Sequence, residues 1–148
     1  MRLRAHSLEV DLPPRWEGRI FRIEGGEPTL HAANFALPER DGDFGAGALG
    51  SMGANGAFLA LTEFEPALAS SALFAHRGIP RRVAVGDLSP KALQRRRPGE
   101  AGLQRFFHDR DRAFCLYVVV GTEPSRAHLV RFVNRVLGTL AIGPRPAP

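Results

Sequence analysis

Residues 101–121 read AGLQRFFHDRDRAFCLYVVVG, and this stretch decides the fold. Apolar side chains alternate along both halves, and the charged run DRDR separates them, which is the pattern of a β-hairpin. With Arg110 and Asp111 at the tip, His108 lies opposite Ala113 and Phe106 lies opposite Cys115. The sequence therefore predicts two long antiparallel strands in this register.

The register assigns each side chain of the hairpin to one of two faces, because successive residues of a strand point in opposite directions. The first face holds Phe106, His108, Cys115, Tyr117 and Val119, and the second holds Leu103, Phe107, Phe114, Leu116, Val118 and Val120. Because both faces are apolar, the hairpin is either covered twice within the monomer or offers its first face to a partner.

Four aromatic or histidine side chains are the candidates for partner binding. If the first face of the hairpin is open, Phe106, His108 and Tyr117 line the binding surface. The fourth candidate is Trp16, which follows Pro13-Pro14. Tryptophan is frequent at binding hot spots, although packing in the core is the alternative role for this residue.

The remaining elements complete an α+β pattern. Strands are expected at residues 7–12, 18–23, 29–37 and 58–64, a short helix after Ser89-Pro90, and a longer helix after Pro124-Ser125. Consecutive strands joined by short turns favour antiparallel pairing. We expect one α+β domain over residues 1–142, an antiparallel sheet of about six strands with the C-terminal helix and short helices packed on it. A flexible proline-rich tail is expected over 143–148.

The glycine-rich stretch DGDFGAGALGSMGANG at residues 41–56 contains a match to the G-x-G-x-x-G pattern at Gly45–Gly50. A dinucleotide site needs a strand directly before the first glycine and a long helix after the last. Neither condition is met here, because the segment is short and its further glycines disfavour a helix. We expect a mobile connector with one helical turn capped by Asp43, and no bound nucleotide.

Composition describes an ordinary globular chain of 148 residues, with 44% hydrophobic and 24% charged residues. Its single cysteine, Cys115, cannot form an intramolecular disulfide, which favours a reducing compartment. The first residues lack the apolar core of a signal peptide, and no stretch is apolar enough to span a membrane. We therefore expect a cytoplasmic protein that does not contact a membrane.

No arrangement of residues indicates catalysis, a metal or a cofactor. The five histidines have no paired spacing, and a zinc site would need such spacing or further cysteines. Cys115 and His108 share a strand face, but cysteines in the middle of strands are usually buried and inert. We expect no catalytic residue, no cofactor and no metal.

Positive charge is concentrated between residues 76 and 112, which hold ten arginine or lysine residues against four acidic ones. Such a segment beside aromatic residues is typical of a surface that binds nucleic acid. The simpler explanation for the same residues is a solvated face or a contact with an acidic partner protein. The candidates for this basic surface are Arg81, Arg82, Arg95, Arg96 and Arg97.

The two ends of the chain resemble PsbP-like domains. LEVDLPPRWEGRIF looks like their opening strand, proline and tryptophan, and FCLYVVVG followed by LVRFVNRVLGTLAI looks like their last long strand, C-terminal helix and final short strand. The whole chain looks like small uncharacterised actinobacterial proteins with the same ends. This resemblance implies an antiparallel sheet backed by helices and a history of partner binding; it supplies no catalytic motif.

The expectation for function is a non-enzymatic domain that binds another protein, as an adaptor or chaperone-like subunit. One alternative is a nucleic-acid binder that uses the arginine-rich segment 76–112. The other is a binder of a small ligand, with its pocket between the sheet and the C-terminal helix.

Overall fold

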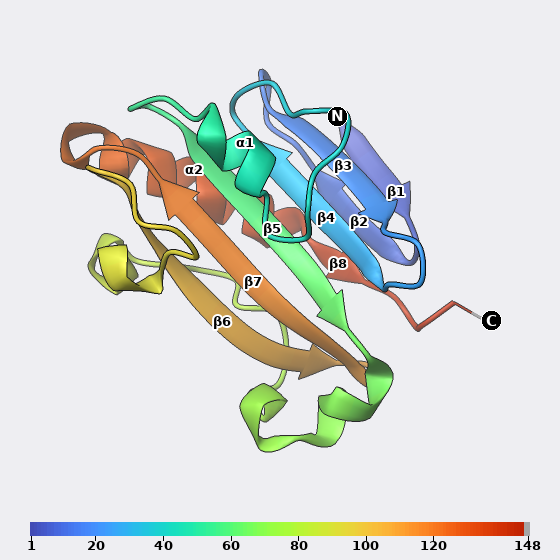
Figure 1. The fold of residues 1–148 in the computed structure, drawn as a ribbon. Helices are drawn as coiled ribbons and strands as arrows, with labels where there is room; N and C mark the ends of the chain where they lie inside the picture. Colours follow the sequence, from blue (N-terminus) through green and yellow to red (C-terminus); the bar gives the residue numbers. More distant parts are fainter. Residues whose placement is uncertain (147–148) are drawn as a thin grey trace.

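The computed structural model describes residues 1–146 and contains two antiparallel sheets and one long helix (Figure 1). A five-stranded sheet has the order β3-β4-β5-β7-β6, and a three-stranded sheet has the order β1-β2-β8. The strands are β1 (Arg2–Ala5), β2 (Leu8–Asp11), β3 (Glu17–Arg22), β4 (Pro28–Ala33), β5 (Ala57–Phe64), β6 (Ala101–Asp109), β7 (Arg112–Val120) and β8 (Ala141–Ile142). The α+β class is confirmed, but the prediction of one sheet with about six strands is wrong.

The extra sheet arises because the two ends of the described chain meet. β2 pairs with β1 on one side and with β8 on the other, so that Leu8 lies opposite Ile142. β1 could not be predicted from the sequence, because its side chains alternate between exposed and half-buried positions and give little apolar signal. This small sheet and the long helix then lie on the same side of the larger sheet.

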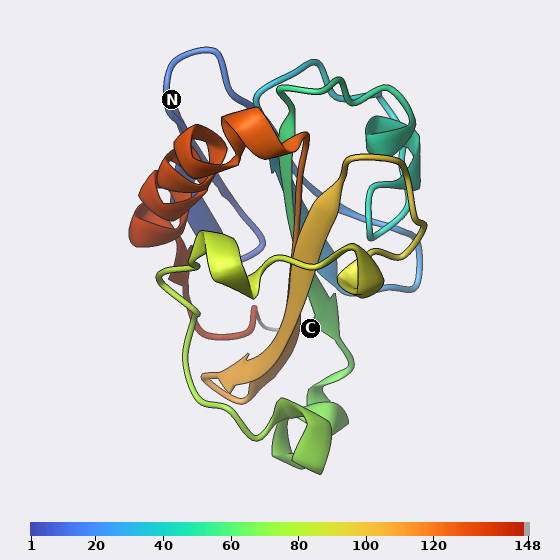
Figure 2. The same cartoon turned by 90° about the vertical axis from the view of Figure 1, so that its left-hand side faces the viewer.

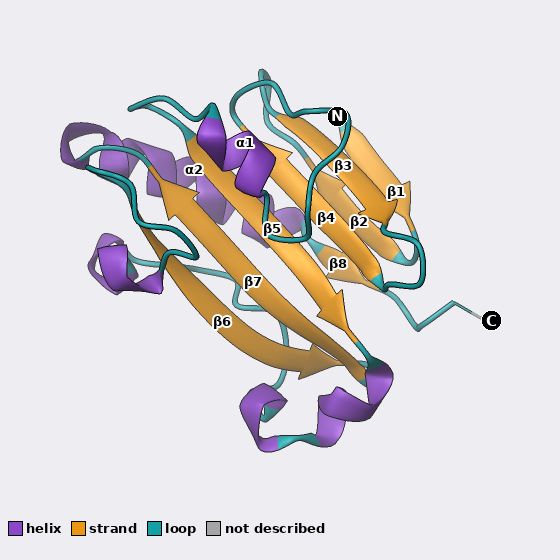
Figure 3. Cartoon of the chain, in the orientation of Figure 1, coloured by secondary structure: helices purple, strands orange, loops and turns teal. Residues whose placement is uncertain are grey.

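Helices and short turns cover both faces of the five-stranded sheet (Figures 2 and 3). Figure 2 shows the sheet nearly edge-on, with α2 on one side and α1 on the other. The helices are α1 (Ala46–Gly50) and α2 (Arg126–Thr139), and the 3₁₀ turns are η1 (Pro66–Ser70), η2 (Ala72–Phe74), η3 (Val85–Asp87), η4 (Pro90–Ala92) and η5 (Glu123–Ser125). A sheet covered on both faces explains why every residue of β7 is buried.

The larger core lies between the five-stranded sheet and α2. The apolar stripe of α2 is Leu129, Val130, Val133, Val136 and Leu137, and all five side chains are buried. They pack with the hairpin face that holds Phe107, Phe114 and Leu116, as the alternation predicted. The hairpin register is also confirmed, with His108 opposite Ala113 and Phe106 opposite Cys115.

The glycine-rich segment connects the antiparallel strands β4 and β5 and contains one short helix, as predicted, and it covers the opposite face of the sheet. Ala48 and Leu49 of α1 are buried against Phe58 and Tyr117 in a second core. Gly45 begins the helix at φ 73°, and a Cβ at this position would collide with the Phe58 ring. Only glycine combines that conformation with such a close approach.

Asp41, and not Asp43, caps this short helix. The Asp41 carboxylate accepts hydrogen bonds from the backbone amides of Gly42, Gly47 and Ala48 at 2.8, 2.8 and 2.9 Å. Asp43 instead accepts a hydrogen bond from the Thr29 hydroxyl of β4. The acidic residues before the glycine run therefore fix the segment to itself and to the sheet.

The proline-rich end of the chain contacts the folded body as far as it is described. The Gly143 amide donates to the Ser7 carbonyl at 2.8 Å, and the Arg145 guanidinium lies 2.7 Å from the Glu27 carboxylate. Ala147 and Pro148, which belong to the predicted flexible tail, lie outside the described residues.

Candidate functional site

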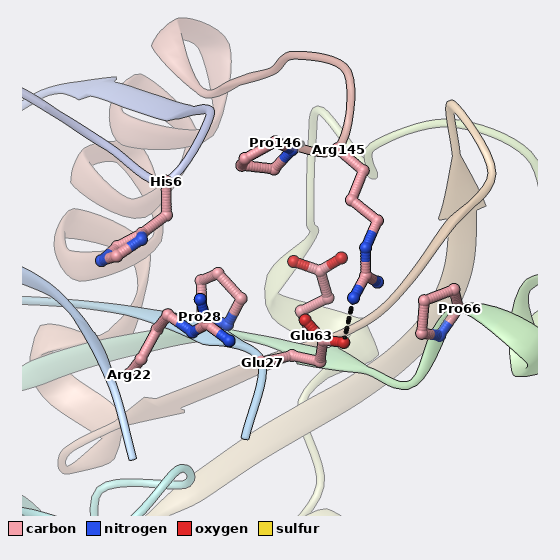
Figure 4. Close-up of a pocket in the computed structure, with 8 residues that line it drawn as sticks. All are labelled: His6, Arg22, Glu27, Pro28, Glu63, Pro66, Arg145 and Pro146. Carbon is pink, nitrogen blue, oxygen red and sulfur yellow. Dashed lines mark hydrogen bonds and ion pairs between the residues drawn. The ribbon is translucent and has the colours of Figure 1, made fainter. Parts of the chain in front are cut away.

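One cavity, of about 720 Å³, lies beneath the C-terminal segment (Figure 4). Its walls carry His6, Arg22, Glu27, Glu63 and Arg145 among prolines. Most of this charge is already paired: Arg145 binds Glu27, and Glu63 binds Arg112 beneath the cavity. A cavity whose ionic groups neutralise one another offers little to a charged ligand, so we do not place the functional site here.

A second hollow, of about 470 Å³, lies between one end of the sheet and the start of α2. We call it the Trp16 groove. It is lined by Pro14, Arg15, Trp16, Asn34, Asn55, Ser125, His128, Leu129 and Phe132. The predicted candidate Trp16 thus contributes to a surface hollow while most of its indole is buried in the core.

Hydrogen bonds hold the floor of the Trp16 groove in place. The Asn34 side chain donates to the Asn55 carbonyl at 2.9 Å and accepts from the Ala57 amide at 2.8 Å. The Ser125 hydroxyl donates to the Asn55 side chain and so joins the start of α2 to the same loop. Because these residues are already held in place, a partner can bind here without a large entropic cost of ordering them.

Aromatic rings and positive charge meet at the rim of this groove. The His128 and Phe132 rings lie edge to face on α2, with their centroids 5.1 Å apart. Among the lining residues that the structure describes, the ionisable side chains are Arg15 and His128, and both are basic. Arg15 also has a positive φ of 70°, which is unusual for a residue with a side chain.

The exposed face of α2 extends this positive rim. His128, Arg131 and Arg135 are exposed and recur at helical spacing, so they form one stripe along the helix. The sequence of α2, RAHLVRFVNRVLGT, contains no acidic residue. Within residues 1–146, no ion pair engages Arg131 or Arg135. We call His128, Arg131 and Arg135 the α2 stripe.

The hairpin candidates lie on the first face of the sheet, where other segments of the same chain cover them. Tyr117 is 1% exposed, and its hydroxyl accepts a hydrogen bond from the Gln94 amide at 2.8 Å. Phe106 packs against Phe74, and the His108 ring bonds the Phe74 carbonyl at 2.7 Å. The structure therefore separates these three residues from Trp16, and no shared surface joins the four candidates.

The arginine-rich segment is divided between the two sides of the five-stranded sheet. The Arg81 guanidinium donates to the carbonyls of Leu137 and Leu140 at the end of α2. Arg97 instead lies near Glu100, 3.9 Å away, next to the Tyr117 side of the sheet. The residues near these two positions, Arg82, Arg95 and Arg96, are exposed. The candidates form two separate groups and not one basic patch.

Cys115 and the histidines do not assemble a reactive centre in the described chain. Burial raises the pKa of the Cys115 thiol to about 12, so the thiol stays protonated. Within residues 1–146, no group of three histidine, cysteine or acidic side chains is placed to hold a metal ion. No helix in the same range has the length and apolar character to cross a membrane.

The sequence analysis did not identify His128 and Phe132 as members of a site. Phe132 counted as one of the apolar residues that recur at helical spacing in the predicted helix. Nothing local showed that the loops of Asn34 and Asn55 would meet these two residues. No protein-family model, curated protein or solved structure matches this chain. The arrangement of the residues therefore carries the functional argument alone.

Proposed function

We propose that this chain is a non-enzymatic, protein-binding domain that recognises an acidic segment of a partner through the Trp16 groove and the α2 stripe. The observation that carries the proposal is the continuity of an aromatic-lined hollow with a helix face that bears two arginines and no acidic residue. Aromatic and arginine side chains are the commonest hot spots of protein interfaces.

The chemistry of the surface specifies the partner segment. An apolar or aromatic side chain of the partner occupies the groove beside Phe132 and the exposed edge of Trp16. Acidic side chains on either side of it lie along His128, Arg131 and Arg135. Charge complementarity of this kind raises the association rate and selects against basic partners.

The proposal also covers ancestry and cellular location. A PsbP-like origin, proposed from the two chain ends, agrees with a domain that binds partners and does not turn over substrates. A cytoplasmic location is proposed from the single cysteine. Fractionation of the native cell, with the chain detected by antibody, checks the location.

A peptide titration tests the proposed function. The probe is a short labelled peptide of alternating glutamate and leucine, and its lysine–leucine counterpart is the control peptide. We expect the acidic peptide alone to bind. The double variant Arg131→Glu/Arg135→Glu should weaken its binding at least about tenfold, because both charges of the stripe are reversed.

The matched control is Arg95→Glu/Arg96→Glu, which changes the net charge equally but on a distant surface. This variant should bind the acidic peptide within about twofold of the wild type. If both double variants lost the same amount of affinity for the acidic peptide, binding would depend only on overall charge, and the proposal would fail. Binding of a labelled oligonucleotide that is lost with Arg95→Glu/Arg96→Glu would instead support the nucleic-acid alternative.

A further inference from the structure

A third cavity, of about 520 Å³, lies beside the edge strand β3, on the face of the sheet that α1 covers and α2 does not. We call it the His31 cavity. Its apolar walls are Phe21 and Ile23 at the end of β3 and Leu37 and Pro38 in the loop that follows β4. The volume is in the range of sites that hold small organic molecules.

Apart from His31, the other lining residues of this cavity are charged: Arg19, Arg22, Glu24, Glu39, Arg40 and Asp41. The polar lining residue that is buried is His31. It lies in the middle of β4, is 2% exposed and lines the cavity wall. Its ring packs edge to face between Phe21 and Phe58, with centroid distances of 4.9 and 5.0 Å. These contacts fix the orientation of the imidazole.

The hydrogen bond of His31 determines its tautomer. Nε2 lies 2.9 Å from the Asp43 carbonyl oxygen, which can only accept, so Nε2 carries the proton and donates. Nδ1 of the neutral ring is then an acceptor with a free lone pair. Burial lowers the pKa of His31; the Asp43 hydrogen bond and the charges of Asp41 and Asp43 oppose this effect, and Arg19 adds to it.

Nδ1 has no partner within the described chain and is not sealed from solvent. Among the described residues, no hydrogen bond reaches Nδ1. A fully enclosed polar side-chain atom without a partner occurs among these residues only at Oε1 of Glu100, so Nδ1 of His31 is not fully enclosed. Nδ1 is therefore reached from the cavity that His31 lines. A buried histidine with an open acceptor beside the apolar walls of a cavity is an arrangement that binds a hydrogen-bond donor.

The cavity is formed in advance by anchored segments. The Thr62 hydroxyl donates to the Asp43 carbonyl at 2.9 Å, and the Arg19 guanidinium donates to the Glu39 carbonyl in the outer wall. Asp41 caps α1 with both carboxylate oxygens, which anchors this part of the cavity wall to the helix. The ligand is then held by His31 and the apolar walls.

We propose that the His31 cavity binds a small apolar, aromatic molecule bearing one O–H or N–H group, which donates its hydrogen bond to Nδ1 of His31. The ring of the ligand packs against Phe21, Leu37 and Pro38. This site is separate from the Trp16 groove and does not depend on the function proposed there.

Matched pairs of probes test this directly. Indole is compared with 1-methylindole, and 2-naphthol with 2-methoxynaphthalene, because each second molecule keeps the ring and loses the donor. Binding to the full chain is followed by chemical-shift changes of Phe21, Ile23, His31 and Leu37 in NMR spectra. We expect at least one donor probe to bind at least about tenfold more tightly than its methylated partner.

Two variants locate the effect. His31→Phe removes the acceptor, and the preference for the donor probe over its methylated partner should disappear. His31→Phe also loses the hydrogen bond to Asp43, so Ile23→Trp serves as a second variant. Ile23 is 45% exposed, and a larger side chain there should narrow the mouth of the cavity without disturbing the core. Ile23→Trp should weaken the binding of both the donor probe and its methylated partner. If neither donor probe shifts the cavity resonances at millimolar concentration, or methylated probes bind as tightly as donors, the proposal is overturned.

Discussion

The guanidinium of Arg112 and the carboxylate of Glu63 form a bidentate ion pair between β7 and β5, with both side chains buried. Nε lies 2.9 Å from Oε2, and Nη2 lies 2.7 Å from Oε1. The remaining donors reach the carbonyls of His6, Ser7 and Gly143. One side chain thus joins the five-stranded sheet to the β1–β2 turn and to the segment after β8.

Replacement of Arg112 by methionine should lower the free energy of unfolding by about 3–5 kcal/mol, because Glu63 is left buried and unpaired. Three backbone carbonyls also lose their donor. Unfolding in urea, followed by circular dichroism, measures the loss. The double variant Arg112→Met/Glu63→Met should recover part of it; a double variant less stable than Arg112→Met alone would contradict this account.

Cys115 should be unreactive in the folded protein. Its side chain is fully buried in β7, and its raised pKa, about 12, leaves almost no thiolate at neutral pH. Ellman's reagent should therefore react only after unfolding in guanidinium. Rapid modification of the native protein would mean that β7 opens far more readily than its burial implies.

Glu100 should destabilise the folded protein when it is ionised. Its Oε1 atom is enclosed without a hydrogen-bond partner, and burial raises the pKa of this carboxyl, against a weaker opposing effect of Arg97. The folded state therefore holds its proton more tightly than the unfolded state. The protonated Glu100 therefore contributes its full stabilisation below the ordinary glutamate pKa. This contribution is lost as the pH rises through the higher pKa of Glu100 in the folded state.

The variant Glu100→Gln removes that pH dependence. At neutral pH its free energy of unfolding should exceed that of the wild type, and the difference should vanish in acid. Glu65→Gln, at an exposed position, is the control and should change little. The difference in free energy of unfolding between Glu100→Gln and the wild type is measured at neutral and at acid pH. If this difference is less favourable to the variant at neutral pH than in acid, the ionised carboxylate stabilises the fold and the prediction is wrong.

The tip of the β6–β7 hairpin stores backbone strain that substitution should relieve. Arg110 and Asp111 have φ values of 49° and 59°, the left-handed conformation that a two-residue type I′ turn requires. Arg110→Asn/Asp111→Gly should raise the free energy of unfolding by about 1 kcal/mol. Asp111→Val should lower it, and thermal melting of both variants makes the comparison.

The hairpin could be predicted from sequence because its information is local. Alternation fixed the faces, and the charged tip fixed the register, so that Phe107 and Phe114 were placed correctly on the face toward α2. The helix α2 was equally accessible, since its apolar residues recur at helical spacing.

The sites could not be predicted in the same way, because they depend on contacts between distant segments. Nothing near Arg112 in the run DRDR indicates burial, since its partners come from the β1–β2 turn, β5 and the end of the chain. His31 looked like one of five scattered histidines until Phe21 and Asp43 were seen around it. The glycine run gave no sign that it would pack on Tyr117.

The pairing of β2 with β8 has a consequence for biosynthesis. The β1–β2 hairpin is made long before β8, yet Leu8 pairs with Ile142, and Arg112 completes its hydrogen bonds only at Gly143. During translation, the edge of β2 that pairs with β8 therefore remains open until β8 has left the ribosome. A nascent chain of this kind is a natural client for chaperones that act at the ribosome exit, and it gains its native stability in a late step.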